Sequence, residues 1–158
     1  MTFSDRMTIE LGGTALELVH VGKNHSDNSL VMRFPRERIL FAVDFIPVGS
    51  VPGRGMIDFY PLEAEDSMKK VLTMDWDKLI PGHPGAPGGR LGTKQDVRDQ
   101  LTFLQDASAA VKAEAQAGKC WDPVEKDLKL PKYENWANYA QNLPFVLRRY
   151  CALWGRGT

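Results

Sequence analysis

Two histidines and one aspartate stand where a divalent metal ion could be bound. His25 lies in the polar segment Gly22–Asn28 between two expected strands, and His83 follows a short apolar segment. Asp44 ends the apolar run Ile39–Val43, where a carboxylate is costly unless it is hydrogen-bonded or binds a metal. Imidazole and carboxylate groups suit divalent metals, so the three residues form a candidate metal site. Loop histidines are also often simply solvated, and spacing alone leaves both interpretations open.

The other polar residues and the glycine-rich segment are weaker candidates for a functional site. His20 lies on the face of an expected strand, which is typical of a packed or hydrogen-bonded residue. Asp27 either makes turn contacts or orients His25. The glycine-rich segment Gly88–Gly92 lacks the Gly-Lys-Ser/Thr ending of a phosphate-binding loop. The candidate chemistry therefore rests on His25, Asp44 and His83.

Short strands are expected to position these residues. Apolar and polar residues alternate along the first part of the chain, the period-two pattern of half-buried strands. The predicted strands are residues 7–11, 16–20, 29–34, 38–44 and 78–80. Short turns between the first four favour an antiparallel meander. The run Ile39–Val43 is apolar on both faces, which predicts a central strand covered on each side.

Helices dominate the second half of the chain. The strongest pattern lies between a capping residue, Thr93, and a glycine stop, Gly118, with apolar residues three and four apart. The other predicted helices are residues 62–73, 122–130 and 144–154. Two long loops, 46–59 and 81–92, are rich in glycine and proline and are expected to line any pocket. Strands first and helices later predict an α+β, layered α/β fold.

Composition describes an ordinary globular protein. The chain has 158 residues with 20 basic and 20 acidic side chains, so we expect a single domain over 1–158 that binds neither nucleic acid nor membrane. No apolar run is long enough to cross a bilayer, and no secretory signal is visible. Cys120 and Cys151 are interpreted as buried thiols rather than a bridge. These features together predict a cytoplasmic location.

Three segments, taken in order, resemble the C-terminal half of the metallo-β-lactamase superfamily. They are Gly22–His25 before a strand, Asp44 at a strand end, and His83 within Pro-Gly-His. Residues 129–156 also resemble the C-terminal helices of hydrolase-like members. The resemblance implies half of a layered αββα sandwich with the metal site at one edge. It implies that His25 is the third histidine of a first metal, Asp44 the bridging carboxylate and His83 the histidine of a second metal.

The sequence departs from that family in one respect. The His-x-His-x-Asp-His signature of the N-terminal half is absent, and too few residues precede Gly22 to contain it. The general acid/base aspartate of the family is missing with it. The resemblance therefore implies a residual site for about one metal ion per chain, zinc in the first instance, with iron or manganese also accepted by these ligands.

Two functions remain open at this stage. The first is a zinc-dependent metallo-hydrolase in which a metal-bound hydroxide, rather than a protein side chain, attacks a small-molecule substrate. The alternative is a non-catalytic dimeric or interaction module that needs a partner to complete the fold. Another chain could also supply the missing half, and the sequence could be a piece of a longer one.

A chain that forms only half of the sandwich is expected to need a partner. Two packed sheets bury their inner faces against each other, so one sheet alone leaves an apolar face uncovered. We therefore expect a homodimer through this uncovered sheet face, or a heteromeric partner that supplies the missing layer.

Overall fold

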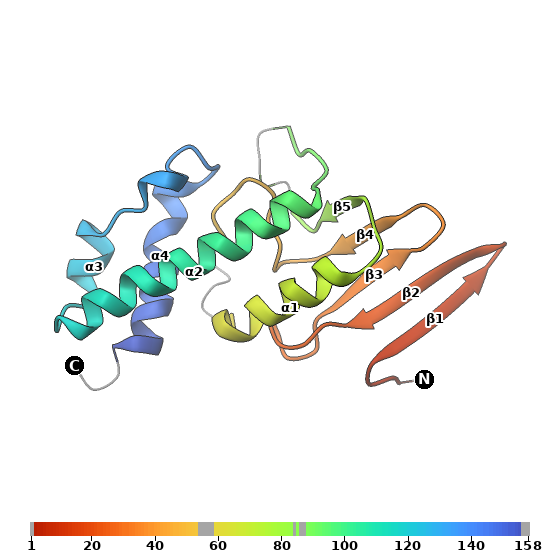
Figure 1. The fold of residues 1–158 in the computed structure, drawn as a ribbon, viewed down its shortest axis with the longest axis horizontal. Coiled ribbons are helices and arrows are strands. Elements are labelled where there is room, and N and C mark those ends of the chain that lie inside the picture. The colour runs from red at the N-terminus through yellow and green to blue at the C-terminus, as the bar shows by residue number, and fades with distance from the viewer. Residues whose placement is uncertain (1, 54–58, 84, 86–87, 156–158) are drawn as a thin grey trace.

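A computed structural model describes residues 2–53, 59–83, 85 and 88–155 and shows one sheet followed by helices (Figure 1). The strands are β1 (Arg6–Leu11), β2 (Thr14–His20), β3 (Leu30–Phe34), β4 (Ile39–Ala42) and β5 (Lys78–Pro81). The helices are α1 (Pro61–Thr73), α2 (Lys94–Gln116), α3 (Asp122–Asp127) and α4 (Tyr139–Trp154), with a 3-10 turn at Pro131–Tyr133. The predicted α+β class and strand positions are confirmed, with small shifts at the ends. Residues 54–58, 84 and 86–87 of the two predicted pocket loops lie outside the described part of the chain.

The strands follow each other across the sheet in sequence order. β1 to β4 form the predicted antiparallel meander, and β5 pairs with β4 in parallel. Helix α1 makes the crossover that a parallel pair requires. In this topology the end of β2, the start of β3 and the ends of β4 and β5 lie side by side, so one edge of the sheet is formed by these strand ends. That edge carries the three candidate metal ligands.

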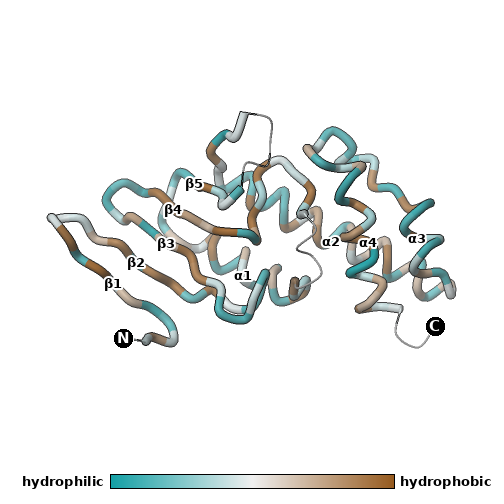
Figure 2. Tube along the Cα trace, turned by 180° about the vertical axis from the view of Figure 1, so that it is seen from behind, coloured by the Kyte–Doolittle hydropathy of each residue, from teal (hydrophilic) through white to brown (hydrophobic). Residues whose placement is uncertain are grey.

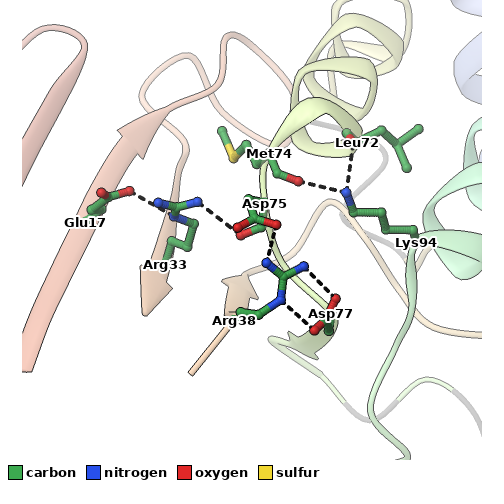
Figure 3. A network of polar contacts seen from close by, with 8 residues as sticks. All are labelled: Glu17, Arg33, Arg38, Leu72, Met74, Asp75, Asp77 and Lys94. Atoms are coloured by element: carbon green, nitrogen blue, oxygen red, sulfur yellow. Dashed lines mark hydrogen bonds and ion pairs between the residues drawn. The ribbon is translucent and has the colours of Figure 1, made fainter. Parts of the chain in front are cut away.

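A network of polar contacts closes the α1 crossover at the opposite end of the strands (Figure 3). The Arg33 Nε atom lies 2.9 Å from Glu17 Oε2, and its Nη1 atom donates to the Asp75 carbonyl oxygen at 3.0 Å. Arg38 pairs with both Asp75 and Asp77. The hydrogen bond from Arg38 holds the pKa of the Asp77 carboxyl below its usual value. These contacts fix where β5 begins beside β4.

One face of the sheet packs against helices α1 and α2. Its residues are Val19, Val31, Leu40, Ala42 and Leu79, all buried in the hydrophobic core. The prediction that residues 39–43 are covered on both faces is wrong for the described residues. Leu40 and Ala42 are buried, but Ile39 and Phe41 are only half-buried and Val43 is 37% exposed. The reason is that the helices cover one face only.

Helix α2 forms where the sequence predicts it. The Thr93 side chain accepts a hydrogen bond from the Asp96 amide, and the Asp96 carboxylate accepts one from the Thr93 amide at 2.8 Å, which makes a capping box. Gly118 follows the helix with φ +73°, a left-handed conformation that favours glycine. Helix α4 begins at Tyr139, five residues earlier than predicted, with Pro144 inside it. A proline at this position removes one backbone hydrogen bond and crowds the preceding turn, and packing of α4 against the core offsets that cost.

The expectation of two free thiols is wrong. Cys120 and Cys151 form a disulfide with an S–S distance of 2.09 Å. They lie 31 residues apart in sequence, and only the return of α4 alongside α2 brings their Cα atoms to 5.7 Å. Disulfides are typical of oxidising compartments, so one ground for a cytoplasmic location is removed. No helix in the described ranges is both long and apolar enough to cross a membrane.

Candidate metal centre

The structure brings the three predicted ligands together. The Nε2 atom of His25 lies 3.6 Å from Asp44 Oδ2, and the Nε2 atom of His83 lies 2.6 Å from Asp44 Oδ1. Each oxygen of one carboxylate therefore faces one imidazole. The His25 and Asp44 side chains are about 30% exposed and that of His83 is 78% exposed. The cluster opens to solvent on the His83 side.

Asp44 and His83 are neighbours because a glycine allows two loops to touch. Gly82 lies so close to the end of β4 that a Cβ atom there would be 2.9 Å from the Cα atom of Val43 and 3.2 Å from the Asp44 amide nitrogen. Asp44 itself has φ +70°, which turns the chain sharply after the strand. The Pro-Gly-His segment thus delivers the imidazole to the end of β4.

A buried asparagine shapes the His25 loop. The Asn24 side chain is fully buried, and its Oδ1 atom accepts a hydrogen bond from the His25 amide at 2.6 Å. Its Nδ2 atom donates to the Gly22 carbonyl oxygen at 3.2 Å. The Asn24 carbonyl oxygen also accepts from the Tyr60 amide, just before α1. Asn24 therefore binds backbone atoms on both sides of itself in the chain and fixes the position of the His25 backbone.

Helix α1 supports the same loop through a buried hydroxyl. The Ser67 Oγ atom donates to the Lys23 carbonyl oxygen at 2.9 Å and accepts from Asn24 Nδ2 at 3.4 Å. Gly22 has φ +104° and lies close to this serine: a Cβ atom on Gly22 would be 3.3 Å from Ser67 Oγ. The roles of Asn24 and Ser67 were not predicted from the sequence. The available signal was a serine beside Met68 on the apolar side of the predicted helix.

His20 and Asp27 stand apart from the cluster. The His20 Nε2 atom lies 3.3 Å from the carbonyl oxygen of Asp27, so His20 is hydrogen-bonded to the loop, as the sequence indicated. Asp27 takes part through its backbone rather than through its carboxylate.

The three side chains are of the types that bind zinc. Their donor atoms, however, do not surround one point at which an ion could sit. Two ligands about 2.1 Å from a tetrahedral zinc lie roughly 3.4 Å apart, and the 3.6 Å between His25 and Asp44 matches that spacing. The 2.6 Å between His83 and Asp44 is a direct contact of the two side chains. Across the described ranges, no three His, Cys, Asp or Glu side chains form a cluster arranged to hold a metal ion. The exposed His83 imidazole would have to move outward for an ion to enter.

Comparison with known proteins identifies the fold. No protein-family model matches the sequence. A metallo-β-lactamase from Pontibacter korlensis has a TM-score of 0.58 and 21% identity, covering 66% of this chain and 48% of that one. The metallo-β-lactamase DIM-1 has a TM-score of 0.55 and 20% identity, covering 66% of this chain and 47% of that one. A double mutant of the sec-alkyl sulfatase PisA1 has a TM-score of 0.68 and 15% identity over 97% of this chain and 26% of its own.

One curated relative is similar in sequence. It is the 2,4-dinitroanisole O-demethylase subunit alpha of Nocardioides sp., 29% identical over 80 residues. The match covers 50% of this chain and 24% of that protein, so this chain spans about a quarter of the relative it matches. Together with the structural matches, these findings show a partial metallo-β-lactamase fold: half of the αββα sandwich, with its sheet and one layer of helices.

Proposed function

We propose that this chain binds one zinc ion through His25, Asp44 and His83 and that the site serves metal-dependent hydrolysis of a small molecule. One observation carries the proposal: the two oxygens of the Asp44 carboxylate each face an imidazole Nε2 atom at one edge of the sheet. Structural likeness to metallo-β-lactamases supports it at the level of the fold.

Each side chain has a distinct task in this proposal. His25 binds through Nε2 from a loop that Asn24 and Ser67 hold in place. Asp44 supplies the negative charge, and His83 closes the site from the solvent side. When bound, zinc supplies a Lewis acid and lowers the pKa of its water ligand to about 7. Three protein ligands leave a coordination position for substrate.

The substrate is assigned as a class. The structural matches include β-lactamases and a sulfatase, and a demethylase subunit matches in sequence. One fold can carry several reactions, so the proposal names only a small molecule as substrate. The family's acid/base aspartate has no counterpart here, so we expect slow hydrolysis by this chain alone.

Metal content tests the site directly. Elemental analysis of protein that was never exposed to chelator should find about one zinc per chain. His83→Ala and His25→Ala should each lose it, because two ligands hold zinc weakly. His20→Ala is the matched control, a histidine near the same edge that contacts a backbone carbonyl instead. Unchanged zinc in His83→Ala would refute the three-ligand site.

A second function is a non-catalytic dimeric or interaction module. Two observations favour it: the absence of a closed metal-binding cluster among the described residues and the uncovered apolar face of the sheet. A folded protein that neither contains zinc as purified nor binds added zinc would support this alternative.

A further inference from the structure

The sheet has a second apolar face, directed away from the helices. Strand register places Met7 opposite Leu18, Leu18 opposite Met32, Met32 opposite Phe41 and Phe41 opposite Ile80. These five residues form one continuous row across all five strands, here named the outer face. Figure 2 shows the apolar stretches of β2, β3 and β4 that contribute to it.

The outer face has no cover within the described residues. Neighbouring positions on the same strands, such as Val19, Val31 and Leu79, belong to the core under the helices. Alternation along a strand turns the row to the opposite side. None of the five residues belongs to the core or to the half-buried residues packed against it. Met7, Leu18, Met32 and Phe41 are half-buried on their own side of the sheet, and Ile80 is 36% exposed.

The five residues of the row are uncharged, and one charged residue, Lys78, lies beside them on the same side of the sheet, paired with Ile39. The pairs Ile9–Leu16 and Phe34–Ile39 flank the row on the same side of the sheet. The charged pair Glu17–Arg33 lies on the other side, at alternate positions. An antiparallel sheet that faces water normally places polar residues outward, whereas the centre of this face is apolar and its polar residues, His20 and Lys78, lie at strand ends.

The size of this surface matches the largest apolar patch of a typical monomer, which is often functional. Strand spacing and rise give its five strands a projected area on the order of 400 Å². A single apolar patch of that size marks an interaction site. A standard interface buries about 800 Å² per partner around an apolar centre. The outer face with its flanking pairs is large enough to be that centre.

We propose that a second copy of this chain covers the outer face, sheet against sheet. The uncharged row can meet itself across a two-fold axis without burying an unpaired charge, because Lys78 lies on the edge strand β5, at the rim of such an interface. The chain carries 20 basic and 20 acidic side chains, so two copies do not repel each other at long range. Two copies bring together the two sheets of a sandwich, of which one chain holds half. The proposal does not depend on metal binding.

Solution mass tests the proposal. At about 10 μM, sedimentation equilibrium should give twice the 17.7 kDa of one chain. Met32→Glu and Ile9→Glu should each weaken the dimer at least ~100-fold, because every dimer would then bury two carboxylates. Leu62→Glu on α1 is the matched control: Leu62 is 40% exposed and Ile9 is 44% exposed, but Leu62 lies on a helix away from the outer face. Circular dichroism melts confirm that each variant is folded, and Ile9 at the rim remains informative if Met32→Glu does not fold.

Cross-linking tests the geometry. Met32 lies on β3 in the middle of the row, so a two-fold axis through the outer face brings the two Met32 side chains close together. Cys120 and Cys151 are bonded to each other, so an added cysteine would be the free thiol. Met32→Cys should give a covalent dimer with a short bismaleimide, and Leu62→Cys should not.

Two results would overturn the proposal. A monomeric wild-type chain would mean that a different chain, or another segment of a longer chain, covers the face. A dimer that survives both Glu substitutions would place the interface elsewhere, for example along the outer edge of β1.

Discussion

Asn24 is the residue on which the geometry of the candidate site most depends. Its buried side chain accepts from the His25 amide and donates to the Gly22 carbonyl oxygen. Asn24→Ala leaves a buried amide without a partner, so we expect a loss of about 1–3 kcal/mol in the free energy of unfolding. Because an orienting contact is lost, we also expect zinc affinity to fall roughly 10–100-fold. Urea unfolding and zinc titration measure the two effects.

The control for that prediction lies in the same loop. Asn28 is exposed and its side chain accepts from Ser26 Oγ, so Asn28→Ala should leave both quantities nearly unchanged. Equal zinc affinity in Asn24→Ala and wild type would show that the loop does not need this side chain to present His25.

The three candidate ligands were predicted from the sequence, but the residues that position their loops were not. His25, Asp44 and His83 carry side chains whose chemistry is recognisable wherever they lie. Asn24 and Ser67 act through hydrogen bonds to backbone atoms, and these exist only once α1 lies against the loop. The disulfide was missed for the same reason, because its two cysteines meet only through tertiary packing.

Among the elements, α2 offers a pH-dependent test through its N-terminal cap. Burial alone would raise the pKa of the Asp96 carboxyl, but hydrogen bonds from Arg90 and Thr93 outweigh it and hold the pKa below its usual value. A lowered pKa in the folded state means that the stabilisation is present above about pH 4 and is lost as the pH falls through the folded-state value. The α2 cap should therefore weaken in acid.

Comparison of variants isolates this contribution. Urea unfolding at pH 7 and near pH 2.5 should show that Asp96→Asn lowers stability at pH 7 by about 1 kcal/mol, the usual worth of a cap, and much less in acid. Asp99→Asn, on the next turn of α2, should show no such pH-dependent difference. A constant deficit of Asp96→Asn at both pH values would contradict the role of its charge.

Most helices and strands could be predicted from local sequence patterns because residues close together in the chain determine them. The alternation in β1 to β4 and the Thr93–Asp96 capping box are written in adjacent residues. The start of α4 was misplaced because Pro144 is a good helix start in isolation, whereas packing recruits an earlier turn from Tyr139. Coverage of β4 was also misjudged, since an apolar residue on a strand does not say which layer lies over it.

At the scale of the whole molecule, the sheet and the C-terminal helices lie at opposite ends, and α2 connects them (Figure 1). The candidate metal site and the outer face belong to the sheet end. The disulfide between Cys120 and Cys151 belongs to the helical end, where it ties the loop after α2 to α4. The sequence predicted half a sandwich with an open face, but it could not show this separation of parts.

Because the two ends are separate, we expect the disulfide to contribute to the free energy of unfolding without affecting the candidate metal site. The double variant Cys120→Ser/Cys151→Ser frees a closed loop of 31 residues, so chain entropy should lower the free energy of unfolding by about 3–4 kcal/mol. Zinc content and dimer mass should stay at wild-type values, because neither depends on the helical end. Urea unfolding, elemental analysis and sedimentation of the same samples measure all three. A variant that keeps wild-type stability, or that loses zinc while remaining folded, would show that the two ends are not independent in this way.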